Sequence, residues 1–432
     1  WGSIGDQTVS NSLYIPRMTG SQSTWVIGTA RLYQFGTPAS VSSIITWQDI
    51  TTLDVGLEAR FFNGDLGFAG AWFRRDTENM IVPQEGLPAT YGTSAPQSNY
   101  GSLRTNGFEL QLDYNHRFAS GLGINIVAAF SDALTKITKY GTTNSIDSWY
   151  VGKTYGEIWG YETDRLYQKS DFEYDSNGKL IEVTSKDGFK IYKLSDPNAP
   201  TQGKLQNSSN FKFGPGDVKF KDLNGDGLIT PGNRLLKDAN GNPDYGDLKI
   251  IGNNTPRYEY SLRAGLDYKG VDFSVFMQGV GKREEWGNGF LAIPGYQSSD
   301  GAMPQAIAGN FWREDRPDAF YPAPYNMAGA YTTNNMQIQT RYLLNMAYFR
   351  IKNITLGYSL PADRLKKAKI SKIRIYASLE NFLTFDHLGT LPIDPEVISG
   401  YSMWNTSNYN LGRTGVGIPT FKSASLGVQV NF

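Results

Sequence analysis

The sequence contains no cysteine among its 432 residues. That absence excludes disulfide bridges, thiol catalysis and cysteine-type zinc sites. Histidine is nearly absent too, with only His116 and His387, so neither a multi-histidine metal site nor a histidine-based catalytic centre is expected. The chain also has no excess of either charge, because Lys+Arg and Asp+Glu both number 41. A nucleic-acid partner normally requires a basic excess. We therefore expect neither thiol-based nor histidine-based catalysis, and no nucleic-acid partner.

Long apolar runs are lacking as well, since none approaches the ~18 residues that a membrane-spanning helix needs. The chain opens at Trp1 without a basic and apolar leader, and we expect that processing or truncation removed its front. The mean hydropathy of −0.40 would favour a soluble protein. A transmembrane barrel can have an equally low mean hydropathy, because only every second strand residue faces lipid and the loops are polar.

Aromatic residues and glycine are abundant, with 26 Tyr, 23 Phe, 9 Trp and 47 Gly, which suits an all-β protein. Apolar residues alternate with polar ones in segment after segment, as where Leu53, Val55 and Leu57 alternate with Asp54 and Glu58. The other alternating stripes lie at 108–114, 122–130, 258–268, 271–277, 373–379 and 424–432. A soluble sandwich alternates too. Charge on one face in strand after strand instead favours a water-filled lumen.

Short and long connections follow one another in strict alternation. Asn63-Gly64 and Lys269-Gly270 are tight hairpin signals. The long connections are expected near 2–47, 75–104, 133–257, 282–345 and 383–420. Short periplasmic turns and long extracellular loops are typical of outer-membrane barrels. The sequence therefore predicts a transmembrane antiparallel β-barrel, of which this chain supplies about nine or ten strands.

Several blocks of sequence carry a resemblance to a known family. They are FRIKNITLGYSLP at 349–361, RIYASLENFLTF at 374–385, GIPTFKSASLGVQVNF at 417–432, NYGSLRTNGFEL at 99–110 and DVKFKDLNGDGLI at 217–229. These blocks follow one another along the chain in the order of the family, and they resemble the C-terminal half of SusC/RagA-type TonB-dependent transporters. The resemblance implies a barrel of about 22 strands, of which this chain would be the C-terminal part, without the plug domain or the TonB box.

The same resemblance implies active nutrient import across the outer membrane of a Gram-negative bacterium, in which no bond is made or broken, so we expect no enzymatic activity. In the family, a SusD-like surface lipoprotein caps the barrel, and TonB acts through the N-terminal part to move the plug. An oligosaccharide or a peptide would be the substrate, and membrane lipid would surround the barrel. Two alternatives stay open: a passive porin, which shares the strands but has no plug, and a soluble glycan-binding β-protein.

One polar loop has the ligand spacing of a calcium loop. Asp222, Asn224 and Asp226 occupy its positions 1, 3 and 5, and Leu228 would offer its carbonyl. Asn233 stands where a bidentate Glu is expected, which weakens the predicted affinity. The alternative is an ordinary turn rich in Asn, Asp and Gly.

Four loop aromatics, Trp286, Trp312, Tyr401 and Trp404, are candidates for contact with the substrate or the lid, because their flat faces can stack on sugar rings. The alternative is that they pack the loops or belong to the interfacial belt. Phe432 ends the last apolar stripe, and a terminal aromatic of this kind generally serves outer-membrane proteins as an assembly signal.

Overall fold

The protein is described from a computed structural model of the chain, which forms two compact units. One comprises Trp1–Leu57, Gly70–Glu109 and Asp132–Tyr155, and the other comprises Glu58–Ala69, Leu110–Ser131 and Gly156–Phe432. The residues that the structure describes are 2–6, 15–16, 18–38, 40–42, 45–83, 90, 96–141, 144–206, 211–287, 305, 308–324, 334–361, 365, 370–396 and 420–431.

Within these ranges, the long elements are β-strands. They are β1 (Gly2–Asp6), β2 (Gly20–Ile27), β3 (Ala30–Phe35), β4 (Gln48–Phe61), β5 (Leu66–Pro83), β6 (Gln97–Arg117), β7 (Gly123–Lys139), β14 (Arg257–Tyr268), β15 (Val271–Lys282), β18 (Tyr348–Ser359), β19 (Lys372–Asp386) and β20 (Ser423–Asn431). The shorter strands are β8 (Glu157–Tyr161), β9 (Thr163–Leu166), β10 (Glu182–Thr184), β11 (Lys190–Tyr192), β12 (Val218–Phe220), β13 (Leu248–Asn253), β16 (Glu284–Trp286) and β17 (Leu343–Asn345). Three single 3-10 turns are η2 (Phe62–Gly64), η4 (Lys169–Asp171) and η5 (Gly203–Leu205). No helix in the described ranges is long and apolar enough to cross a membrane.

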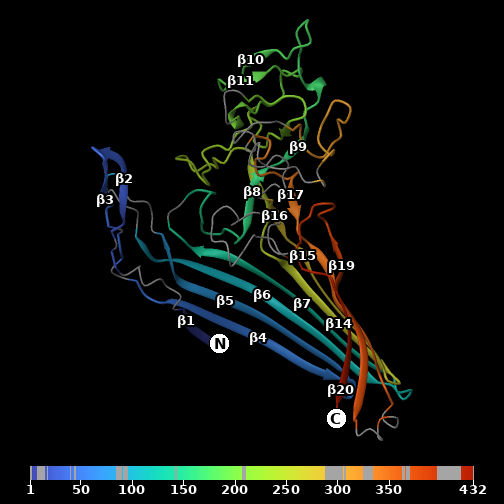
Figure 1. Cartoon of the computed structure of the whole chain (residues 1–432). Helices are drawn as coiled ribbons and strands as arrows, with labels where there is room; N and C mark the ends of the chain where they lie inside the picture. Colours follow the sequence, from blue (N-terminus) through green and yellow to red (C-terminus); the bar gives the residue numbers. More distant parts are fainter. Residues whose placement is uncertain are drawn as a thin grey trace. The chain divides into compact units, whose positions relative to one another are not determined.

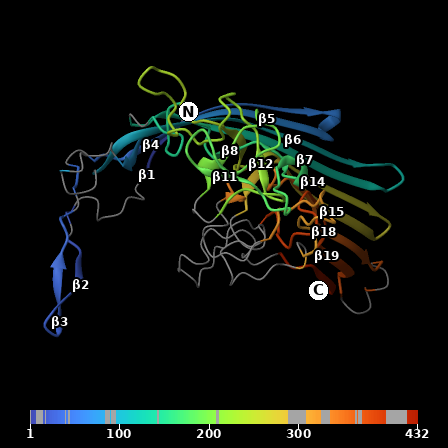
Figure 2. The same cartoon turned by 90° about the horizontal axis from the view of Figure 1, so that it is seen from above.

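One ten-stranded sheet contains most of the long strands, in the order β1-β4-β5-β6-β7-β14-β15-β18-β19-β20. Figure 1 shows β4, β5, β6 and β7 side by side, and Figure 2 shows β14, β15, β18 and β19 side by side. The pairing is antiparallel, and Leu262 of β14 lies opposite Met277 of β15 on one side and Ala128 of β7 on the other. Neighbours in the sequence are therefore neighbours in the sheet, as the sequence predicted.

The tight turns fall where the sequence placed them. Lys269 and Gly270 form the two-residue connection from β14 to β15, with φ angles of 47° and 87°. Two successive positive φ angles characterise the hairpin turn whose twist matches that of the strands. Asn63 and Gly64 also have positive φ, 57° and 97°, between β4 and β5.

Some strands run further than the sequence predicted, so several of the expected loop bounds move. The loop expected at 75–104 shrinks to 84–96, because β5 and β6 extend into it. The stretch 2–47 holds β1 and the β2–β3 hairpin, β7 continues to Lys139, and β19 continues to Asp386. Backbone pairing does not need apolar side chains once a strand has left the hydrocarbon layer, so periodicity does not mark these extensions.

The two faces of the long strands differ in chemistry. Apolar side chains on one face of β4 and β20 are exposed, as at Val55 (61%), Leu57 (64%), Leu426 (79%) and Val428 (63%). Exposed apolar rows of this kind suit contact with lipid. On the opposite face of β6, Asp113 accepts a hydrogen bond from the Arg60 guanidinium.

Three ion pairs bridge two strands by passing over a glycine on the strand between them. The sets are Arg60, Gly67 and Asp113; Arg117, Gly123 and Asp267; and Asp272, Gly357 and Arg374. The paired nitrogen and oxygen atoms are 2.5, 2.7 and 2.5 Å apart. A Cβ on these glycines would lie 2.3, 2.2 and 2.6 Å from the nearest charged side chain. The glycines thus leave the space that the ion pairs occupy on the polar face.

The excursion between β7 and β14 forms a small structure of its own. Strand β8 pairs with β13, and β9 pairs with β12. The core of this region includes Val218, Phe220 and Ile229, which are at most 1% exposed. These buried apolar residues form a local hydrophobic core, so the excursion between β7 and β14 is a folded structure and not an irregular loop.

Buried polar groups dock this excursion onto residues of the later loop. Asn335 accepts a hydrogen bond from the Val218 backbone N–H at 2.8 Å and donates to the Asp217 carboxylate at 2.6 Å. The Tyr161 N–H donates to the Ile338 carbonyl at 2.8 Å. Because unpartnered buried polar groups are costly, these pairings fix how the two segments pack.

We expect Leu110→Arg to destabilise the full-length protein by about 2–4 kcal/mol, since it places a charge on the lipid face of β6. Gln111→Arg, on the opposite face, should be nearly neutral. The free energy of folding into lipid vesicles measures both. Equal costs, or a larger cost for Gln111→Arg, would contradict the assignment of the faces.

Candidate functional site

A cluster of charged side chains stands on the last strands of the sheet, around Arg350 of β18. The strand register places Gln278 of β15 opposite Arg350 on one side and Thr384 of β19 opposite it on the other. The three side chains therefore form a row across three strands. Arg350 is only 4% exposed, so its charge needs partners close by.

The Arg350 guanidinium uses all of its nitrogen atoms. Its Nε donates to Thr384 Oγ1 at 2.8 Å, and Nη2 donates to Asp394 Oδ1 at 2.7 Å. Its Nη1 donates to Glu396 Oε2 at 2.6 Å and to Thr420 Oγ1 at 2.5 Å. The planar fork of arginine suits this arrangement, because one side chain satisfies several oxygen atoms at fixed angles.

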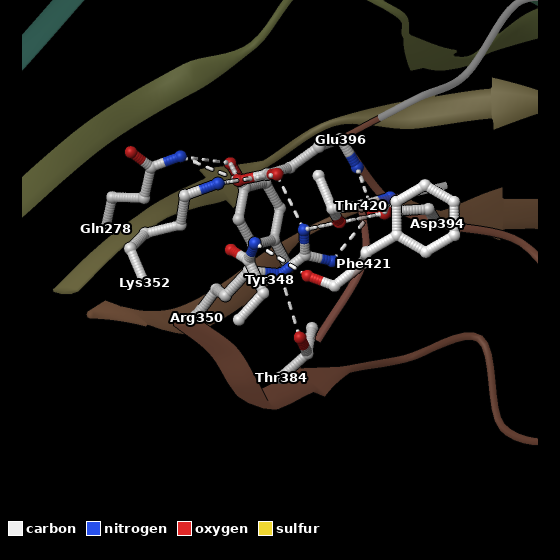
Figure 3. Close-up of polar contacts among 10 residues, drawn as sticks. Gln278, Tyr348, Arg350, Lys352, Thr384, Asp394, Glu396, Thr420 and Phe421 are labelled. Carbon is white, nitrogen blue, oxygen red and sulfur yellow. Dashed lines mark hydrogen bonds and ion pairs between the residues drawn. The ribbon is translucent and has the colours of Figure 1, made fainter. Parts of the chain in front are cut away.

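Glu396 is the second centre of the cluster, as Figure 3 shows. Gln278 Nε2 donates to its Oε1 at 2.7 Å, and the Tyr348 hydroxyl donates to the same atom at 3.1 Å. Lys352 Nζ lies 3.0 Å from Oε2. Two cations, Arg350 and Lys352, thus balance the two carboxylates of Asp394 and Glu396.

Asp394 is held ionised. Burial alone would raise its pKa from the ordinary 3.8, but hydrogen bonds from the Arg350 guanidinium, the Thr420 hydroxyl and the backbone N–H groups of Glu396 and Thr420 lower it to about 2. Because the folded-state pKa lies below the ordinary value, the ionised carboxylate stabilises the fold above pH 3.8. This contribution is lost as the pH falls towards 2.

The segment between β19 and the cluster is also held by apolar packing. Leu388 and Ile393 are buried with Leu344 and Met346, and Trp286 packs against this group. Thr420, which precedes β20, accepts from Arg350 and donates to Asp394 Oδ2 at 2.5 Å. The cluster therefore joins residues from both ends of the last outer loop to the wall of the sheet.

A hollow of about 290 Å³ opens beside this segment. Its lining consists of Asn310, Phe320, Tyr321, Arg341, Tyr342, Leu343, Leu344, Asn345, His387, Leu388, Gly389, Thr390 and Leu391. The rings of Tyr321 and Tyr342 are stacked with their centroids 5.6 Å apart, and burial raises the pKa of Tyr321 to about 12. Phe320 is 42% exposed. The hollow thus combines an aromatic side with polar groups.

Two of the four aromatic residues singled out from the sequence can be placed. Trp312 is 8% exposed, and its indole N–H donates to Gln168 Oε1 at 3.3 Å. Trp286 lies in β16 against the apolar group around Leu344. The structure does not bring these two together at the hollow. Their contact with a substrate or lid stays a prediction.

The other predicted positions fall partly beyond what the structure describes. Tyr401, Trp404 and Phe432 lie outside the described residues, and the assembly role of Phe432 stays a prediction. His116, to which no role was given, lies 2.6 Å from the Asp65 carboxylate through Nδ1. His387 lines the hollow.

In the loop with calcium spacing, the side chains bond to the loop's own backbone. The Asp222 carboxylate accepts from the N–H groups of Gly225 and Gly227, and Asp226 accepts from that of Leu228. Within the described part of the chain, no three acidic or histidine side chains gather as metal ligands.

The two predicted asparagine ligands are paired with carboxylates. The Asn224 side chain donates to Asp226 at 3.1 Å, and Asn233 donates to the Asp244 carboxylate at 2.5 Å. This geometry is that of a hydrogen-bonded turn. Calcium binding stays a prediction.

Comparison with known proteins gives one consistent group of relatives. The chain is 25% identical over 403 residues to TonB-dependent receptor P3 of Formosa agariphila, covering 90% of this chain and 34% of the relative. It is 23% identical over 423 residues to TonB-dependent receptor SusC of Bacteroides thetaiotaomicron, covering 93% and 35%. A solved structure of the RagAB peptide transporter matches with a TM-score of 0.63 at 18% identity, covering 100% of this chain and 40% of that one. No family model matches.

The chain is of the SusC/RagA type. Its ten-stranded sheet is part of a transmembrane β-barrel in the outer membrane of a Gram-negative bacterium. It spans about a third of the length of the curated relatives that it matches.

Sequence reasoning missed the Arg350 cluster of this SusC/RagA-type barrel. Arg350 and Lys352 stand on one side of an apolar strand, and Asp394 and Glu396 have the same two-residue spacing further along the chain. Two cations and two acids with matching spacing are a signal that could have suggested pairing. The aromatic residue Phe320 gave no such signal, because aromatics are common in this chain.

Arg350→Gln in the full-length SusC/RagA-type protein should loosen the segment 387–396, because breaking a buried ion pair costs about 3–5 kcal/mol. Without the Arg350 guanidinium the pKa of Asp394 should rise above its parent value of about 2, so protection should be lost at a higher pH than in the parent protein. Hydrogen exchange of that segment measures the effect. Arg374→Gln, which breaks another ion pair, is the matched control. Unchanged exchange in Arg350→Gln would contradict the anchoring role.

If the loop 222–233 binds calcium, calcium should protect it from protease in the parent protein. Asp222→Ala combined with Asp226→Ala should abolish that protection, because the two carboxylates supply the predicted charge. Limited proteolysis with and without a chelator measures this. If calcium does not change the proteolysis of the parent protein, the loop is an ordinary hydrogen-bonded turn and the calcium prediction is wrong.

Proposed function

We propose that the intact protein imports a nutrient, either an oligosaccharide or a peptide, across the outer membrane and is energised through TonB. The chain would supply part of the barrel wall and a set of long outer loops. The observation that carries this proposal is the match over nine-tenths of the chain to proteins named TonB-dependent receptors. Binding and passage require no bond to be made or broken, and the proposal assigns no enzymatic step.

The proposal includes two protein partners. A SusD-like surface lipoprotein would cap the outer loops, and TonB would act on a part of the protein beyond this chain. The charged face of the strands supports the transport role, because ion pairs such as Arg374–Asp272 suit a water-filled lumen. The compact packing of the outer excursion supports a docking role, since a preformed surface loses less entropy when a partner binds.

Uptake by cells that carry the full-length protein tests the proposal. Deleting TonB should abolish protein-dependent uptake of labelled oligosaccharides and peptides, since no other energy source moves the plug. Deleting the transporter gene gives the background rate. Uptake that persists without TonB and falls only when the transporter is deleted would indicate a passive pore and contradict active import.

A further inference from the structure

The hollow described above presents hydrogen-bond donors. Asn310 uses its Oδ1 to accept from the Phe320 N–H at 3.3 Å, and Asn345 uses its Oδ1 to accept from the Ala347 N–H at 3.0 Å. Among the residues that the structure describes, neither side chain gives its Nδ2 a partner. Each amide therefore retains two N–H donors at the lining of the hollow.

Arg341 adds a positive charge to the same lining. Its Nε donates to the Phe320 carbonyl at 2.8 Å and its Nη2 donates to the Ala319 carbonyl at 3.1 Å, which fixes the side chain. The same guanidinium lies over the Phe320 ring, 5.2 Å from its centroid, and interacts with the Tyr342 side chain. The lining contains no Asp or Glu, so nothing in it neutralises Arg341. Charge complementarity therefore favours an anionic group.

Another part of the lining is apolar. Leu343, Leu344, Leu388 and Leu391 line the hollow together with the half-exposed ring of Phe320. Sugar hydroxyls need polar partners on many sides, and four leucines offer none. An apolar side chain forfeits no hydrogen bond on such a surface, and its transfer from water lowers the free energy. The volume of about 290 Å³ is large enough for one or two amino-acid residues.

We propose that this hollow binds the C-terminal residue of a peptide, provided that residue is apolar. Its side chain would lie on the leucines and Phe320, and its carboxylate would accept hydrogen bonds from Asn310, Arg341 and Asn345. The inference rests on the proposed import function and assigns that function a substrate class. Arg350 is a positioning residue here, because its cluster anchors the segment that supplies His387 to Leu391.

Binding to the full-length protein, purified with its lipoprotein partner, tests the proposal by calorimetry. The probes are a synthetic hexapeptide ending in Leu, the same peptide with a C-terminal carboxamide, and a neutral glucose hexamer. The acid should bind at least about tenfold more tightly than the amide, since hydrogen bonds to a charged group are strong. The glucose hexamer should not compete with it.

Asn310→Asp combined with Asn345→Asp is the informative variant. Each Asp keeps the oxygen that accepts the backbone N–H, so the fold is retained, but it replaces a donor with a negative charge. The variant should lose at least about tenfold in affinity for the acid peptide and bind the amide almost as before. Asn177→Asp, in an exposed turn away from the hollow, is the matched control and should change neither.

The outcomes separate this inference from the import function. Equal binding of acid and amide, no peptide binding at all, unchanged affinity in the double variant, or competition by the glucose hexamer would each overturn the inference. TonB-dependent uptake measured in parallel would persist in those cases if the import function holds. Loss of TonB dependence would instead count against the function on which the inference rests.

Discussion

Every backbone N–H and C=O of a strand that crosses lipid must find its partner on a neighbouring strand, because lipid offers none. This constraint explains the continuous ten-stranded ladder and the one-residue alternation that follows from it. Once a strand is paired on both edges, its side chains can only point to two faces. Lipid selects residues such as Leu57 and Val428 on one face. Water permits pairs such as Arg117–Asp267 on the other, with Gly123 leaving the room between them.

The outer end of the sheet adds a second requirement, since the loops must keep a definite shape without lipid around them. Arg350 of β18 holds the last loop in place, because it donates hydrogen bonds to Asp394, Glu396 and Thr420 of that loop. A buried arginine left without these acids would be costly, so the cluster forms as a unit. The aliphatic packing of Leu388 extends the anchoring to the edge of the hollow. A preformed hollow then loses little entropy when a ligand enters it.

The sheet was predictable because alternation and turn chemistry are local properties of the sequence. Lys269-Gly270 could be placed without knowing anything distant from it. Strand ends were not predictable, because β5 and β6 continue through polar residues once hydrocarbon no longer selects side chains. The Arg350 cluster was missed for a different reason, since its partners lie 34 to 70 residues away along the chain. Trp312 shows the same limit, because its burial against Gly216 depends on a contact between distant loops.

The central claim is that one face of each long strand meets water and the other meets lipid. The absence of cysteine makes a direct test possible, because each introduced cysteine is then the only thiol in this part of the protein. Ser261→Cys and Leu262→Cys, neighbours on β14, should be compared in the full-length protein in vesicles. A water-soluble maleimide should label Cys at 261 and a lipid-soluble one should label Cys at 262. Faster labelling of position 262 by the water-soluble reagent would contradict the claim.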